Sequence, residues 1–97
     1  MSKLDQAKML MKVRKLQKEL QKEIITVTTG DDAVKVEITG EQKIKRISID
    51  PERVNLDDIR ELEKWVEEAV KDAIAKSQKH AAEKMQPMMG MLGDLGL

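Results

Sequence analysis

Three short stretches rich in β-branched residues, set between two long stretches free of glycine and proline, constrain the fold of this chain most. Residues 24–29 read Ile-Ile-Thr-Val-Thr-Thr, and β-branched side chains favour strand over helix. Residues 33–39 alternate apolar and polar side chains, which predicts a strand with one buried and one solvated face. Residues 43–49 predict a third strand, in which a β-bulge would bring Ile44, Ile47 and Ile49 to one face.

Tight turns separate the three strands and indicate an antiparallel meander. Gly30-Asp31-Asp32 and Gly40-Glu41 provide the turn residues. Residues 3–22 predict a first helix with a narrow apolar stripe of Met9, Val13, Leu16 and Leu20. A second helix is predicted over residues 56–85, with Asn55 as its N-cap and with Pro87 ending it. The predicted fold class is therefore α+β, in the order helix, three-stranded antiparallel β-meander, long C-terminal helix.

The predicted lengths of these elements indicate a compact body, formed by the sheet and the part of the last helix that covers it, and an arm, formed by the part of the helix beyond the sheet. A helix over residues 56–85 would be about 45 Å long, whereas a seven-residue strand spans about 23 Å. The helix must therefore extend beyond the sheet. We expect one domain over residues 1–87 and a flexible tail over residues 88–97, which is rich in Met, Gly and Leu. The alternative for the tail is a soft surface for protein docking.

The hydrophobic residues available for a core are few and mostly aliphatic. The 97 residues include one Trp, no Phe and no Tyr, and a small domain with such a core gains from a second subunit. We therefore expect a homodimer, with Trp65 as an anchor in the core or at the interface. The sequence contains no Cys, which excludes disulfides and thiolate metal sites. Neither a signal peptide nor an apolar stretch long enough for a membrane span is recognisable, so a cytoplasmic protein without a membrane partner is expected.

The charges are balanced overall but separated along the chain. The sequence has 18 basic and 18 acidic residues. Residues 3–22 carry seven basic and two acidic residues, residues 57–72 carry three basic and seven acidic residues, and residues 73–86 carry three basic and one acidic residue. Such separation produces surface patches of opposite sign.

No residue pattern in the sequence indicates catalysis or cofactor binding. The chain has one histidine, His80, which is expected to be a solvated surface residue and cannot form a metal site alone. The acidic residues Asp57, Asp58 and Glu61 are explained by the dipole of the helix that they begin. We therefore expect no enzyme activity, no metal, no cofactor and no small-molecule substrate.

The basic residues of the two helices are candidates for contacts with the phosphates of DNA. Seven basic residues over about five helical turns are suited to binding a polyanion such as DNA. An equally good interpretation is a helix face that is merely solvated. Because no aromatic side chains are interspersed with them, single-stranded nucleic acid is a less suitable partner. The candidate DNA-binding residues are Lys3, Lys8, Lys12, Arg14, Lys15, Lys18, Lys22, Lys76, Lys79 and Lys84.

Several segments together resemble the YbaB/EbfC family of bacterial nucleoid-associated proteins. Residues 34–40, Val-Lys-Val-Glu-Ile-Thr-Gly, are similar to the second strand and turn of that family, and residues 47–51, Ile-Ser-Ile-Asp-Pro, are similar to the end of its third strand. The Lys/Gln/Leu/Met-rich first helix and the acidic start of the last helix are also similar, so the resemblance covers about residues 8–85. It implies an intertwined homodimer with projecting helical arms around duplex DNA, a nucleoid role and no cofactor.

These observations favour a nucleoid-associated protein that binds double-stranded DNA as a homodimer, through phosphate contacts of low sequence specificity. Lys outnumbers Arg, and lysine suits phosphate better than it suits the edges of bases. The alternative is a dimeric adaptor or chaperone-like module that binds another protein.

Overall fold

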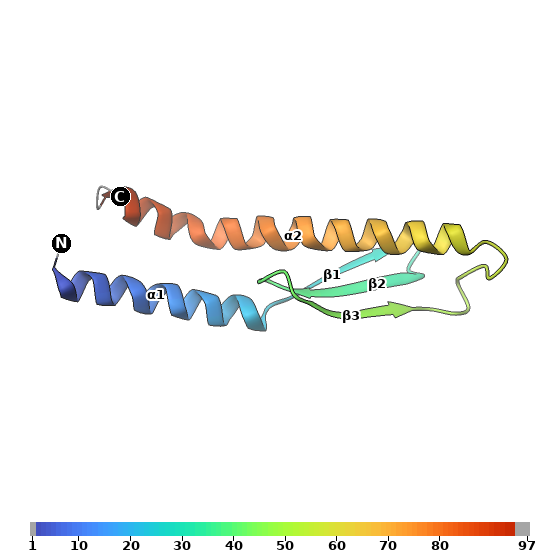
Figure 1. Ribbon diagram of the computed structural model, residues 1–97, viewed down its shortest axis with the longest axis horizontal. Helices are drawn as coiled ribbons and strands as arrows, with labels where there is room; N and C mark the ends of the chain where they lie inside the picture. The colour runs from blue at the N-terminus through green and yellow to red at the C-terminus, as the bar shows by residue number, and fades with distance from the viewer. Residues whose placement is uncertain (1, 95–97) are drawn as a thin grey trace.

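The computed structural model describes residues 2–94 and has the predicted order of elements. Helix α1 spans Lys3–Lys22 and helix α2 spans Ile59–Asp94. Between them lie β1 (Ile24–Thr29), β2 (Val34–Thr39) and β3 (Ile44–Ile49). The α+β fold expected from the sequence is confirmed (Figure 1).

The three strands form one antiparallel sheet in the order β1-β2-β3. Glu37 of β2 pairs with Arg46 of β3, whereas its neighbour Ile38 pairs with Ile44. Lys45 is left between these two pairs, so the β-bulge predicted in the third strand is present. The bulge places all three isoleucines of β3 on one face of the sheet.

The core lies between β1, β2 and the first half of α2. Val34, Val36 and Ile38 of β2 are fully buried, and so are Ala69 and Ala73 of α2. Because alanine has only a methyl side chain, these two residues allow α2 to approach the sheet closely. Larger residues of α2, such as Trp65, pack beside them against the same core.

Helix α2 begins later and ends later than the sequence predicted. Asn55 is not its N-cap: the Asn55 side chain accepts a hydrogen bond from Asp57 N, while Asp58 Oδ1 accepts one from Glu61 N and caps the helix. The prediction that Pro87 ends the helix is also wrong, because α2 continues through Pro87 to Asp94. Figure 1 shows the last turns leaving the axis of the rest of α2, as expected where proline removes a backbone hydrogen bond.

The predicted tail is therefore helical over residues 88–94, and residues 95–97 lie outside the described part of the chain. Met88 is buried, with 7% of its surface exposed, and it lines a shallow hollow with Leu16 of α1. Burial of Met88 favours continuation of the helix beyond the proline. The mobility of residues 88–97 stays a prediction.

Two helical arms project from the same end of the sheet. Figure 1 shows α1 and the second half of α2 side by side beyond the strands, with both chain termini at the far end. We call residues 75–94 the distal part of α2. The molecule measures 64 × 20 × 15 Å, so the predicted extension of the long helix past the sheet is confirmed.

The third strand is uncovered on the face where the other two strands meet α2. Ile44, Ile47 and Ile49 lie opposite the buried residues of β2 and therefore share their face. Among the described residues, α2 contacts β1 and β2 but not β3, and the three isoleucines are 43%, 43% and 45% exposed. An apolar edge strand thus faces outward in the single chain.

Candidate nucleic-acid interface

Helix α1 presents most of the predicted DNA-binding residues to solvent. Ser2 caps the helix by accepting a hydrogen bond from Asp5 N, and no proline or glycine interrupts it. The cations of α1 predicted to bind DNA are all exposed, namely Lys3, Lys8, Lys12, Arg14, Lys15, Lys18 and Lys22. This helix therefore offers a long cationic surface.

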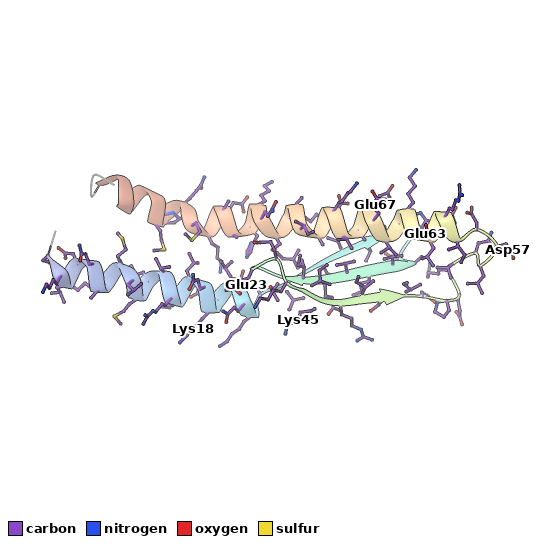
Figure 2. All side chains as sticks on the ribbon, in the orientation of Figure 1. Lys18, Glu23, Lys45, Asp57, Glu63 and Glu67 are labelled. Carbon is purple, nitrogen blue, oxygen red and sulfur yellow. The ribbon has the colours of Figure 1, made fainter. Side chains whose placement is uncertain are left out.

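The apolar stripe of α1 turns inward and fixes which way the cations face. Leu20 is buried, and its carbonyl oxygen accepts a 2.9 Å hydrogen bond from Gly40 N at the β2–β3 turn. A Cβ atom at Gly40 would lie 2.8 Å from Leu20 Cδ2, so the glycine permits this close approach. Lys18 points away from α2 in Figure 2. We therefore call the side of α1 remote from α2 its outer face.

The outer face of α1 also carries apolar side chains that the sequence reasoning passed over. Leu4 is 63% exposed and Met11 is 69% exposed. Both lie off the inward stripe, because they do not continue its spacing of three and four residues. The signal in the sequence that could have revealed them is a second, shorter series of apolar residues at helical spacing.

Of the three predicted cations of distal α2, Lys84 lines a hollow together with Lys12 and Lys15 of α1. Lys76 and Lys79 are exposed. Ser77, which lies between them in sequence, is buried against the β2–β3 turn, and residues one or two positions away on a helix point in other directions. Lys76 and Lys79 therefore point away from the β2–β3 turn that buries Ser77.

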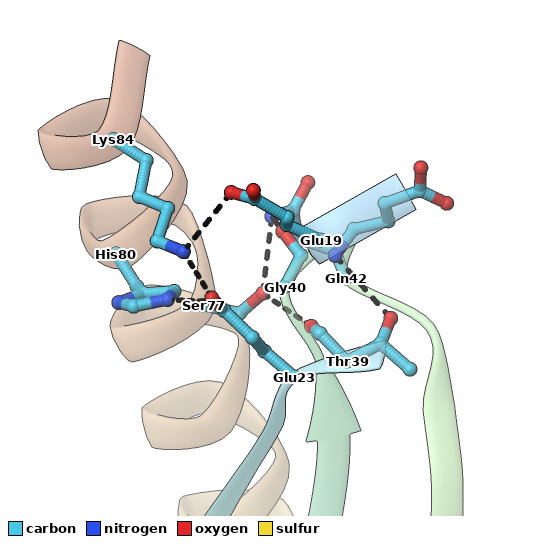
Figure 3. A network of polar contacts seen from close by, with 9 residues as sticks. Glu19, Glu23, Thr39, Gly40, Gln42, Ser77, His80 and Lys84 are labelled. Carbon is cyan, nitrogen blue, oxygen red and sulfur yellow. Dashed lines mark hydrogen bonds and ion pairs between the residues drawn. The ribbon is translucent and has the colours of Figure 1, made fainter. Parts of the chain in front are cut away.

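Lys84, the third predicted residue of distal α2, is turned toward α1. It forms ion pairs with Glu23 and, at 3.7 Å, with Glu19 (Figure 3). The expectation that His80 is a solvated surface residue is wrong, because its Nε2 atom contacts the same Glu23 carboxylate and the side chain is half-buried. Hydrogen bonds from Lys84, and then from His80, hold the pKa of Glu23 below its ordinary value.

A second set of contacts ties distal α2 to the turn between β2 and β3. Ser77 is fully buried in α2, and its hydroxyl donates to Thr39 O at 2.7 Å. Gln42 Nε2 donates both to Ser77 Oγ at 3.0 Å and to Gly40 O at 2.9 Å. Figure 3 shows this set beside the ion pairs of Glu23. Together the two sets form a clamp at the base of the arms, which fixes α1 relative to α2.

The clamp predicts a pH-dependent part of the stability. A carboxyl group whose pKa is lowered on folding stabilises the folded state above its unfolded pKa of about 4.3, and that contribution is lost as pH falls through the lowered value. We expect Glu23→Gln to cost at most about 1 kcal/mol at pH 7, since partly exposed ion pairs contribute little. Thermal melts should show the difference from wild type shrinking toward zero as the pH falls below the lowered pKa of Glu23. Glu63→Gln, at an exposed position of α2, is the control, and an equal pH effect there would contradict the assignment.

The acidic residues gather at the opposite end of the molecule. Figure 2 shows Asp57, Glu63 and Glu67 near the start of α2, far from the arms. The separation of charge along the sequence is therefore also a separation in space. A polyanion meeting the arms is thus kept away from most of the carboxylates of the same chain.

The part of the chain that the structure describes has no features of a membrane span or a metal site. None of its helices is long and apolar enough to cross a membrane. Residues 2–94 contain no group of three or more His, Asp or Glu side chains placed to hold a metal ion.

Comparison with known proteins shows one consistent family. A family model described as the YbaB/EbfC DNA-binding family matches residues 1–92. A nucleoid-associated protein of Desulforamulus reducens is 38% identical over 97 aligned residues, covering 93% of this chain and 92% of the relative. A nucleoid-associated protein of Chloroflexus aurantiacus is 37% identical, covering 86% of this chain and 83% of the relative.

A solved structure supports the fold independently. The crystal structure of an uncharacterized protein from Helicobacter pylori matches with a TM-score of 0.78 and 18% sequence identity. The match covers 86% of this chain and 87% of the other. It shows that the arrangement of a small sheet with two projecting helices occurs in both proteins.

Proposed function

Because this chain belongs to the YbaB/EbfC DNA-binding family, we propose that it is a nucleoid-associated protein whose homodimer binds duplex DNA mainly through phosphates. The observation that carries the proposal is the surface of α1, on which all seven basic residues of the helix are exposed. Exposed cations in a row along a helix release counterions when they meet the phosphate backbone. Low sequence specificity follows, because phosphates are the same in every duplex.

The uncovered face of β3 supports the homodimer. Ile44, Ile47 and Ile49 present about half of their surface to solvent on the side of the sheet that elsewhere forms the core. Leu56 and Ile59, at the start of α2, are also exposed. Apolar surface concentrated on an edge strand is typical of an interface. A second copy meeting this face would cover the isoleucines of both chains around a two-fold axis.

Leu16 and Leu20, from the apolar stripe of α1, have neighbours within the single chain. Leu20 packs at Gly40, and Leu16 lies beside Met88. In the proposed dimer the interface is therefore formed by the bodies, and the arms of both chains remain free to approach DNA. Two copies of the basic α1 surface then act on one duplex, which offsets the zero net charge of the chain.

The predicted contact residues differ in what they offer. The cations of α1 and the exposed Lys76 and Lys79 of distal α2 are the proposed phosphate contacts. Lys84 contributes less, because its charge is shared with Glu19 and Glu23. Its main role in this proposal is to hold the two arms together.

The test is the salt dependence of DNA binding on two duplexes of unrelated sequence. Each phosphate contact that is lost should reduce the slope of log affinity against log salt by about 0.9, or by twice that where both chains of a dimer lose one. We expect Lys15→Ala and Lys18→Ala to weaken binding to both duplexes by similar factors. Lys35→Ala, on the sheet, is the matched control and should leave the slope nearly unchanged.

Two results would contradict this mechanism. An affinity that barely changes between low and moderate salt would exclude a dominant phosphate term. A complete lack of binding at low salt would instead favour the adaptor function, in which the exposed Leu4 and Met11 dock a protein partner.

A further inference from the structure

The outer face of α1 has an apolar line along its centre. Leu4, Ala7 and Met11 follow one another at spacings of three and four residues, so they lie on one side of the helix. Met11 is 69% exposed and Leu4 is 63% exposed. Neither is needed by the inward stripe that packs α1 against the rest of the chain.

Basic side chains stand on both sides of Met11. One shallow hollow, of about 380 Å³, is lined by Met11 with Lys8, Lys12 and Lys15. A second, of about 290 Å³, is lined by Met11 with Arg14, Lys15 and Lys18. By helical geometry Lys8 and Arg14, three residues before and after Met11, project to opposite sides of it. The exposed side chain of Met11 thus has basic residues on both of its sides.

We propose that this face of α1 lies in the major groove of duplex DNA and that Met11 contacts the methyl groups of thymine there. The inference rests on the proposed DNA binding and adds a base contact to it. The major groove is about 12 Å wide and admits one α-helix, whose own diameter is about 10–12 Å. The cations on the two sides of the helix then face the two phosphate backbones.

The chemistry of the apolar line formed by Leu4, Ala7 and Met11 favours duplex DNA over other anionic partners. The floor of the major groove offers the C5-methyl group of thymine as its main apolar feature, and the flexible thioether of methionine adapts to such a contact. A helix that lies on a lipid surface needs a wide apolar face, whereas this line is one side chain wide. The basic residues on both sides of the line can contact the two phosphate backbones of a duplex, whereas an acidic peptide would offer only one charged strand.

The experiment compares one A·T-rich duplex with the same duplex in which uracil replaces every thymine. Uracil lacks only the methyl group, and burying one such group is worth about a fourfold change in affinity. Wild type should bind the thymine duplex about fourfold more tightly than the uracil duplex for each α1 helix that makes the contact, which is about fifteenfold if both helices of a dimer do so. Met11→Ala, and Met11→Gln as a second variant of similar length, should bring this ratio close to one without changing the salt slope.

The matched control is Leu10→Ala, the neighbouring residue on α1. Leu10 is also apolar and 51% exposed, but it is rotated by about 100° from Met11. It should keep the wild-type ratio of thymine to uracil affinity. Each duplex is titrated at low and moderate salt, and the mass of every variant is measured by light scattering.

The possible outcomes separate this inference from the proposed function. If wild type binds both duplexes equally, or if Leu10→Ala and Met11→Ala change the ratio alike, the groove contact is overturned while phosphate binding stands. If Met11→Ala lowers the mass of the dimer, Met11 belongs to a protein interface and the inference is also overturned. If wild type binds neither duplex at low salt, the proposed function itself fails.

Discussion

Replacing Ile47 with Asp should convert the proposed dimer into a monomer and remove most of the DNA affinity. Ile47 is the middle isoleucine of the exposed face of β3. In a symmetric dimer the substitution puts an unpaired carboxylate into the interface twice, and each costs several kcal/mol to bury. We expect the dissociation constant of the dimer to rise by about a thousandfold or more. Light scattering should then give 11.0 kDa, the mass of one chain, in place of about twice that value.

The matched control is Ser48→Asp, which makes the same change of charge at the next residue. Ser48 pairs with Lys35, and neighbouring residues of a strand point to opposite faces, so the new carboxylate faces outward beside a cation. This variant should stay dimeric. The monomeric Ile47→Asp protein should bind DNA about a hundredfold more weakly, because it offers one basic α1 helix where the proposed dimer offers two. A wild-type protein that is already monomeric would overturn the proposed interface.

Replacing Gly30 with Ala should destabilise the fold more than any change on the arms. Gly30 has a φ of +63°, and a Cβ atom there would lie 2.4 Å from Cδ2 of Trp65. The positive φ costs about 1 kcal/mol for alanine, and the displaced indole adds about 1–3 kcal/mol of overpacking. The expected loss is therefore about 2–4 kcal/mol, or about 10 °C or more in Tm for a chain of this size at fixed protein concentration.

The indole provides a second measurement. Trp65 is the single tryptophan of the chain, and Thr29 donates a 2.7 Å hydrogen bond to its carbonyl oxygen. Displacement of the ring by the new methyl group should shift its fluorescence toward that of solvated tryptophan. The control is Gly90→Ala, where a Cβ atom meets nothing within 4 Å and helix propensity predicts a gain of up to about 1 kcal/mol. Equal stability of the two variants would show that Trp65 does not pack on Gly30.

The elements themselves could be predicted from the sequence because their causes are local. The β-branched run of residues 24–29 and the alternation of residues 34–39 each depend on neighbours in the chain. The slip of one residue between Ile44 and Ile47 was enough to place the bulge. The C-terminal boundary of α2 could not be predicted in this way, because Pro87 opposes the helix locally while Met88 packs near α1.

The roles of the polar residues of distal α2 depended on contacts between distant parts of the chain. Ser77 is a surface residue by its type, yet the β2–β3 turn buries it and supplies its hydrogen-bond partners. His80 and Lys84 meet Glu23 more than fifty residues away in sequence. A charge pattern identifies a basic segment, but only the packing of α1 beside α2 decides which cations remain available to a partner.

The sequence by itself determined the fold class, the family and the basic character of the first helix, because these follow from local patterns of side chains. The tertiary structure decided which apolar face is left open. An α-helix is about 10 Å wide and strands lie about 4.8 Å apart, so the single helix α2 covers two strands and leaves the third exposed. For this reason Ile44, Ile47 and Ile49, which the predicted bulge brings to one face of the sheet, lie on the surface of the single chain.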